Sequence, residues 1–182
     1  ASLSAGTRYL FIVPPSLVKN WEREIWKFTG WLERFPTIGI VGRSEGQDDV
    51  AWRSEYIIVP DSMLAKDWVY KKLLEIAWDF IAVDEASRFK ESTAARSIAF
   101  YGGAVIKKKK DDKKISTIRY AGLFQSARHV VFLDGSPMPN RPMELWAPAF
   151  ALHPESIDCL EREDFGYRYC GATQNNLGQW EF

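Results

Sequence analysis

The sequence predicts an α/β fold in which helices cover both faces of a mostly parallel sheet. Short apolar runs alternate with segments in which apolar residues recur every three or four positions. Strands that alternate with helices usually pair in parallel, because each helix carries the chain back to the start of the sheet. The 182 residues, 46% of them hydrophobic, are enough for one domain with a buried core.

Five apolar runs are predicted to be strands. Proline cannot donate a ladder hydrogen bond, so Pro14 and Pro60 are expected to end two of these runs. The predicted strands cover residues 9–13, 37–41, 56–59, 80–83 and 129–133.

Five segments are predicted to be helices. In the first, Leu17, Trp21, Ile25 and Phe28 recur at helical spacing and form one apolar stripe. The predicted helices cover residues 17–28, 63–78, 93–101, 116–128 and 142–152.

The charge and cysteine content limit the class of protein. Lys and Arg together number 24, as do Asp and Glu, so a strongly basic DNA-coating protein is excluded while a local basic groove is not. No apolar run is long enough to cross a bilayer. Cys159 and Cys170 cannot staple a chain of this length, and we interpret them as reduced thiols of a cytoplasmic protein.

One segment is strongly basic. Residues 107–114 hold six Lys and two Asp. We interpret this run as a solvated surface loop, and a finger that contacts phosphates is the alternative.

Two adjacent carboxylates, Asp84 and Glu85, end the predicted strand at 80–83. Ligands of open α/β sheets bind beyond the carboxyl ends of the strands. One carboxylate can hold Mg²⁺ through water, and the other can polarise an attacking water. These residues alone are equally compatible with simple capping of the next helix.

Two further segments follow strand ends. Residues 133–140 contain a Gly-Ser-Pro turn that brings amide groups toward the crevice, but Met138 stands where a hydrolase nucleophile elbow needs Gly. Residues 14–21 combine a helix start with hydroxyl, Lys and amide groups, which suit backbone phosphates. Taken singly, each segment is also compatible with an ordinary turn or cap.

Together the three segments resemble the first ATPase lobe of Snf2-type superfamily 2 helicases. The order is Pro-x-Ser-Leu-x-x-Asn-Trp, then Asp-Glu-Ala, then Leu-x-Gly-Ser-Pro-x-x-Asn-x-x-x-x-Leu-Trp. Residues 14–28 match motif Ia, 57–64 are similar to motif Ib, 83–90 match motif II and 133–146 match motif III. The tail segment 165–170 resembles a stretch of the annealing-helicase and phage-encoded branch.

The resemblance implies a RecA-like fold and a division of the chain. Residues 1–155 would form an incomplete first lobe, and residues 156–182 would extend toward a second lobe. The cofactors would be ATP and Mg²⁺, and the partner would be double-stranded or branched DNA. The protein would be cytoplasmic if bacterial or phage-encoded, nuclear if eukaryotic, and not bound to a membrane.

The resemblance also implies roles for individual residues. Asp84 would hold Mg²⁺ through water, and Glu85 would act as the base for the attacking water. Ser87 replaces the usual His, which weakens the expected link between motifs II and III. That link would also involve Gly135, Ser136 and Pro137. The DNA track would include Ser16, Lys19, Asn20 and Ser62.

The departures from the family pattern are equally informative. None of the twelve glycines is followed by Lys, so the sequence contains no P-loop. We therefore expect a piece of a larger enzyme that is inactive alone. Residues 130–133 would form a sheet edge that another segment, a second copy of the chain or solvent covers. The alternatives are a decayed lobe that only binds DNA or protein, and an unrelated metal-dependent α/β hydrolase.

Overall fold

The computed structural model describes residues 7–30, 36–42, 50–108, 115–136, 140–158, 161–176, 178 and 180–181. Its centre is a five-stranded sheet in the order β2-β3-β1-β4-β7, with every pair parallel. The strands are β1 (Tyr9–Val13), β2 (Ile38–Ile40), β3 (Tyr56–Pro60), β4 (Trp78–Asp84) and β7 (Ala127–Leu133). The predicted parallel α/β sheet is therefore confirmed.

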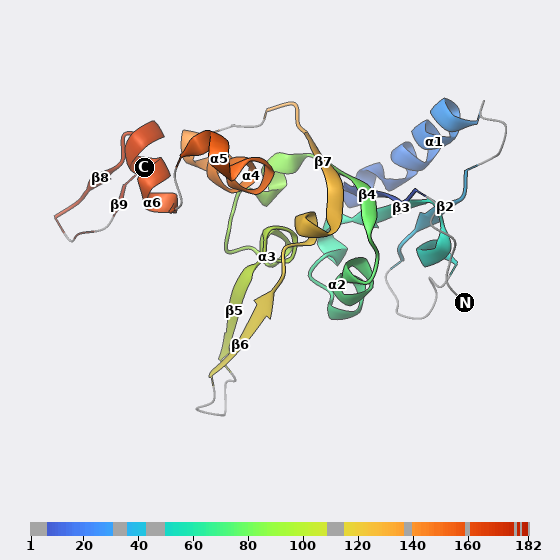
Figure 1. The fold of residues 1–182 in the computed structure, drawn as a ribbon, viewed down its shortest axis with the longest axis horizontal. Helices are drawn as coiled ribbons and strands as arrows, with labels where there is room; N and C mark the ends of the chain where they lie inside the picture. Colours follow the sequence, from blue (N-terminus) through green and yellow to red (C-terminus); the bar gives the residue numbers. More distant parts are fainter. Residues whose placement is uncertain are drawn as a thin grey trace.

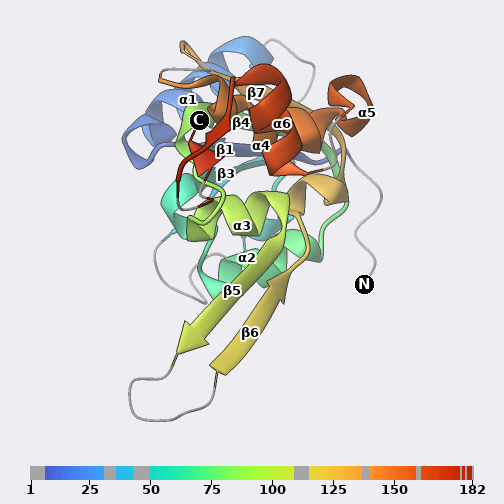
Figure 2. The same cartoon turned by 90° about the vertical axis from the view of Figure 1, so that its left-hand side faces the viewer.

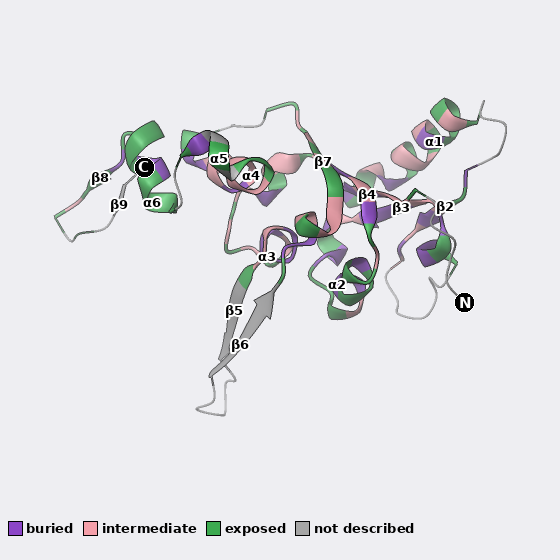
Figure 3. Cartoon of the chain, viewed as in Figure 1, coloured by how far each residue is buried: buried purple, intermediate pink, exposed green. Residues whose placement is uncertain are grey.

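Helices cover both faces of this sheet (Figure 1). Two of them, α2 (Asp67–Leu74) and α3 (Ala95–Tyr101), contribute to the larger apolar core, which also contains Leu10 and Ile57 of the strands. On the other face, α1 (Val18–Thr29) packs against Ile58. Figure 3 shows the buried residues concentrated on the central strands. No helix among the described residues is both long and apolar enough to cross a membrane.

The stripe predicted on α1 is only partly buried. Ile25 is buried and Trp21 is half-buried, whereas Phe28 is 63% exposed. Phe28 lies in the last turn of α1, and the Nζ of Lys27 lies 5.1 Å from the centroid of the Phe28 ring. The helical period of α1 was predicted correctly. Phe28, however, was predicted to belong to the apolar stripe and is mainly exposed.

The helix predicted over residues 116–128 is wrong. The chain there forms β6 (Ile115–Tyr120), a 3-10 turn (Leu123–Ser126) and the start of β7. β6 pairs with β5 (Gly103–Lys108) in an antiparallel hairpin that projects beside α3 (Figure 2). Three of the first four residues of β6 are β-branched, which favours a strand once β5 lies alongside.

Two other predicted helices are shorter than expected. The segment predicted at 63–78 forms a 3-10 turn (Asp61–Met63) and then α2, and Trp78 already belongs to β4. The segment predicted at 142–152 forms a 3-10 turn (Pro142–Leu145) and α4 (Trp146–Leu152). Lys107 and Lys108 of the basic run end β5, and residues 109–114 lie outside the described residues.

The C-terminal segment contains small elements. They are α5 (Pro154–Ile157), α6 (Arg162–Tyr169), β8 (Thr173–Gln174) and β9 (Trp180–Glu181). Met143, Ile157 and Phe165 form a separate apolar cluster. This cluster contains residues from both sides of position 155, and the domain division at that position stays a prediction.

β7 is an open edge of the sheet. Among the described residues β7 pairs only with β4. Val131 and Leu133 are 37% and 38% exposed, high values for apolar residues of a parallel sheet. The sheet edge predicted at residues 130–133 is confirmed, and its unpaired backbone groups are available to another strand.

The burial pattern predicts unequal costs for two Phe→Ala substitutions. Phe100 is fully buried, with ring centroids of Phe89 and Phe132 at 5.6 and 5.8 Å. Phe100→Ala is expected to lower the free energy of unfolding by about 3–5 kcal/mol, since it leaves a cavity. Phe28→Ala is expected to cost less than about 1 kcal/mol. Urea denaturation measures both, and equal losses would contradict the burial difference.

Candidate active site

The parallel sheet brings the three predicted segments to the side of the sheet formed by the carboxyl ends of its strands, here called the carboxyl edge. Ser16 follows β1, Ser62 follows β3, Glu85 follows β4 and Asp134 follows β7. Because these strands are adjacent and parallel, their carboxyl ends are neighbours. Along the edge, the residues after β3 and β1 form one half, and the residues after β4 and β7 form the other half.

Asp84 is held in place by two hydrogen bonds. The indole Nε1–H of Trp21 donates to Oδ2 of Asp84 over 2.7 Å, and the amide of Glu85 donates to Oδ1 over 3.0 Å. Trp21 belongs to α1, so the contact fixes the helix of motif Ia against the end of β4. Each carboxylate oxygen accepts one protein hydrogen bond and keeps a further lone pair for a ligand.

Glu85 has an uncommon backbone conformation. Its φ and ψ are both 53°, in the left-handed region that non-glycine residues rarely adopt. The turn starts the 3-10 helix Ala86–Phe89 immediately after β4 and leaves Glu85 exposed. Strained residues of this kind cluster at functional sites, and the geometry presents the carboxylate of Glu85 to solvent beside Asp84.

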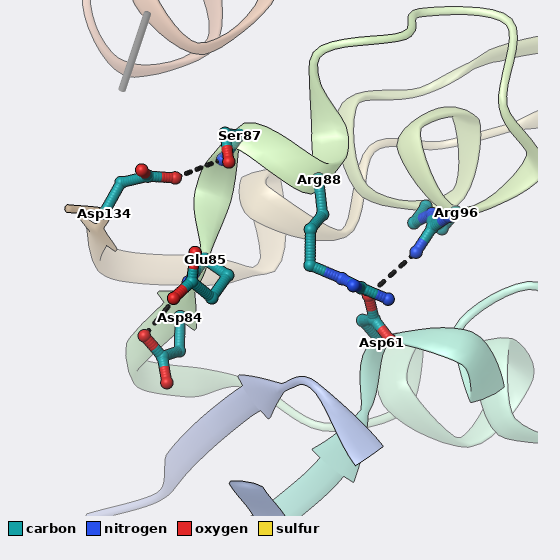
Figure 4. A network of polar contacts seen from close by, with 7 residues as sticks. All are labelled: Asp61, Asp84, Glu85, Ser87, Arg88, Arg96 and Asp134. Atoms are coloured by element: carbon teal, nitrogen blue, oxygen red, sulfur yellow. Dashed lines mark hydrogen bonds and ion pairs between the residues drawn. The ribbon is translucent and has the colours of Figure 1, made fainter. Parts of the chain in front are cut away.

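Asp134 joins the ends of β4 and β7 (Figure 4). Its Oδ2 accepts the amide of Ser87 over 2.5 Å, and its Oδ1 accepts the amide of Ser136 over 2.7 Å. The resemblance led us to expect a weakened link at Ser87. The backbone amide of Ser87 joins the two segments by donating to Asp134, and the effect of Ser87 on coupling stays a prediction.

Asp134 was not among the predicted site residues. The available signal was its position two residues before Ser136 in a turn, where an Asp side chain often accepts a backbone N–H. Burial opposes ionisation of Asp134, but the hydrogen bonds from Ser87 and Ser136 outweigh it and lower the pKa of Asp134 below its ordinary value.

A second contact joins the segments after β4 and β7. Lys90 Nζ donates to Oε1 of Glu144 over 2.9 Å, and the side chain of Asn140 donates to the same oxygen over 3.2 Å. Burial opposes ionisation of Glu144, but these hydrogen bonds and the charge of Lys90 lower the pKa of Glu144. A hollow of about 360 Å³ lies beside this contact, with Ser87 and Asp134 in its lining.

The other predicted coupling residues are exposed or undescribed. A Cβ at Gly135 would meet open space, so packing within the described chain does not require glycine there. Ser136 is exposed, and Pro137 lies outside the described residues.

The four predicted DNA-track residues are all exposed and lie after β1 and β3. Lys19 Nζ pairs with Glu22 at 2.8 Å, and Asn20 Oδ1 accepts a hydrogen bond from Arg23. Ser16 and Ser62 lie on separate 3-10 turns that follow adjacent strands. The structure therefore brings these residues to one half of the edge, and their contact with DNA stays a prediction.

The chain is similar to known proteins of one family. The family described as the SNF2-related domain matches residues 3–113. The ISWI chromatin-remodeling complex ATPase ISW2 of Saccharomyces cerevisiae is 27% identical over 173 residues, which are 92% of this chain and 13% of that protein. The putative ATP-dependent helicase/translocase YwqA of Bacillus subtilis is 30% identical over 141 residues, which are 78% of this chain and 13% of that protein.

A solved structure has the same fold. The Sulfolobus solfataricus SWI2/SNF2 ATPase core in complex with dsDNA matches 90% of this chain and 28% of that chain, with a TM-score of 0.60 and 20% sequence identity. At this identity the likeness shows the RecA-like fold alone. The chain spans 13% of the length of the two curated relatives named above.

The lowered pKa of Asp134 predicts a pH-dependent contribution to stability. Since the folded-state pKa lies below the ordinary value of about 3.9, the ionised carboxylate stabilises the fold above that pH, and the contribution is lost as pH falls through the folded-state pKa. Asp134→Asn should remove the contribution, because Asn offers one acceptor where two amides donate.

Urea denaturation of both proteins between pH 7 and pH 3 measures this contribution. The difference in unfolding free energy is expected to stay constant above about pH 5 and to shrink toward pH 3. A difference that does not change over the whole range would contradict the role of the ionised carboxylate.

Proposed function

Because this chain belongs to the SNF2-related domain family, we propose that it forms the first RecA-like lobe of a DNA-dependent ATPase. The parent protein would couple ATP hydrolysis to movement on, or remodelling of, DNA. The observation that carries the proposal is the meeting of Asp84, Glu85 and Asp134 at the carboxyl ends of β4 and β7. Ligands of open parallel sheets bind at this edge.

Asp84 is suited to Mg²⁺ bound through water. No group of three or more potential metal-ligating side chains occurs among the described residues. A site with one carboxylate fits Mg²⁺, which keeps several waters and takes its remaining ligands from phosphates. When bound, Mg²⁺ would neutralise charge on the phosphates of ATP. The hydrogen bond from Trp21 would fix the orientation of the Asp84 carboxylate toward the ion.

Glu85 would orient the attacking water and accept its proton. Glu85 directly follows Asp84 and is more exposed, so the two carboxylates can have different tasks. Ser87 lies two residues further along and is held by Asp134. A shift of the segment after β4 would therefore move the segment after β7, which is how Gly135 and Ser136 would couple hydrolysis to DNA engagement.

No Gly-Lys pair occurs in the sequence, so in the proposal the P-loop of the parent protein would lie outside these 182 residues. The open edge of β7 is suited to a further parallel strand, since Val131 and Leu133 are partly exposed there. In the proposal, the strand that precedes the P-loop pairs with this edge. A second lobe would complete the ATP site, and residues 156–182 would lead toward it.

The proposed partner is DNA, double-stranded or branched. The solved relative is a complex with dsDNA, and the four exposed DNA-track residues lie in the half of the edge after β1 and β3. The protein would act in the cytoplasm if bacterial or phage-encoded, and in the nucleus if eukaryotic. The match of residues 165–170 to the annealing-helicase and phage-encoded branch remains part of the proposal.

The second candidate is a decayed lobe that binds DNA or protein without hydrolysis. Two sequence observations favour it, namely Ser87 in place of the usual His and the absence of a Gly-Lys pair. The contact between Ser87 and Asp134 weighs against decay, because motifs II and III remain joined.

Glu85→Gln in the parent protein tests the function. Hydrolysis is expected to fall by about 10²–10⁴-fold with nucleotide binding retained, because the amide cannot accept the proton of the water. DNA-stimulated phosphate release measures turnover, and equilibrium binding of a fluorescent ATP analogue measures affinity.

Glu75→Gln is the matched control, since Glu75 lies at the end of α2 and pairs with Lys72 away from this edge. Normal turnover by Glu85→Gln would refute the role of Glu85. A parent protein that binds DNA without any hydrolysis would favour the decayed lobe.

A further inference from the structure

A buried carboxylate, Asp61, holds two arginines at the carboxyl edge of the sheet (Figure 4). Asp61 is fully buried at the start of the 3-10 turn after β3. Arg88 Nε donates to its Oδ2 over 2.5 Å, and Arg96 Nη1 donates to the same oxygen over 2.8 Å. Arg88 comes from the turn after β4 and Arg96 comes from α3, so three segments meet at one carboxylate.

The cluster carries more positive charge than Asp61 requires. A buried carboxylate needs a counter-charge, and one guanidinium supplies it. Two arginines and one aspartate leave a net charge of +1. Two guanidinium groups on one oxygen also repel each other, and an anion on their outer side would relieve that repulsion.

The geometry leaves the donors of both arginines available. An arginine that serves only to neutralise a carboxylate usually binds both oxygens as a fork. Here each arginine donates once, both to Oδ2, and the buried Oδ1 has no hydrogen-bond partner among the described residues. The side chains of Arg88 and Arg96 are 42% and 35% exposed. Within the described part of the chain, most of their N–H groups therefore have no hydrogen-bond partner and can bind a ligand from solvent.

The position favours a nucleic-acid phosphate as that ligand. Asp61 immediately precedes Ser62, a residue of the predicted DNA track, in the half of the edge that follows β3 and β1. Lys19, in the same half, is paired with Glu22 and contributes little net charge. The planar guanidinium fork matches phosphate geometry better than an ammonium does.

We infer that Arg88 and Arg96 form a site for a backbone phosphate of DNA, with Asp61 as the residue that positions both guanidinium groups. The inference rests on the proposed function, because that function supplies the DNA. It adds two phosphate-contacting residues to the track predicted from the sequence.

Arg96→Gln and Arg88→Gln test the site, each leaving one arginine to neutralise Asp61. Duplex binding by this chain is measured by fluorescence anisotropy at several salt concentrations. Loss of one phosphate contact should reduce the slope of log K against log [salt] by about 0.9 and weaken binding about eightfold at 0.1 M salt. Circular dichroism melting checks that each variant is folded.

Arg128→Gln is the matched control. Arg128 is 79% exposed at the start of β7, on the opposite edge of the sheet, and its removal changes the net charge by the same amount. An equal fall of the salt slope in all three variants would overturn the inference, and so would an unchanged slope in all three. Neither result would contradict DNA binding by the chain.

A second measurement separates the site from the proposed function. Inorganic phosphate is titrated into the labelled chain, and the Nε–Hε resonances of Arg88 and Arg96 are followed by NMR. Saturable shifts at both, with none at Arg128, are expected. If the shifts occur but duplex DNA does not bind, the phosphate site stands and the DNA-dependent function fails. If neither occurs, Arg88 and Arg96 serve only to neutralise Asp61, and the inference is overturned.

Discussion

Parallel pairing of the strands is the constraint on which the rest of this structure depends. The strands β3, β1, β4 and β7 run in the same direction. The segment that follows each of them therefore lies at the carboxyl edge of the sheet. That edge receives Asp61, Asp84 and Asp134 from three strands far apart in the sequence. The opposite edge receives Arg128 and Asp79, where the exposed Arg128 pairs with the half-buried Asp79 at 3.6 Å.

Polar side chains then connect the neighbouring segments of the edge. Trp21 binds Asp84 across 63 positions, and Asp134 binds Ser87 across 47. A hydrogen bond to a charged carboxylate contributes about 1.5–3 kcal/mol to stability, and each of these two also fixes the relative position of the segments that it joins. The left-handed Glu85 lies between these two connections and is thereby constrained on both sides.

The faces and the side edges of the sheet are not equally covered. The face toward α2 and α3 contains the larger core, whereas β7 exposes Val131 and Leu133 along an unpaired edge. Apolar residues on an open parallel edge favour pairing with another strand. In the proposed function, the strand that precedes the P-loop would pair with this edge.

The sequence by itself determined the parallel α/β class, the five central strands and the family, because apolar periodicity and ordered motifs are local features. It also located Asp84 and Glu85, since both lie at the carboxyl end of a predicted strand. The β5–β6 hairpin was missed because residues 115–120 are stabilised by pairing with the preceding strand β5, and not by a helical period of their own. The contacts of Asp134, and those of Asp61 with Arg88 and Arg96, are determined only by the tertiary structure. A side chain becomes an acceptor for Ser87, or a counter-charge for Arg88 and Arg96, only when strands separated in the sequence are brought to the same edge.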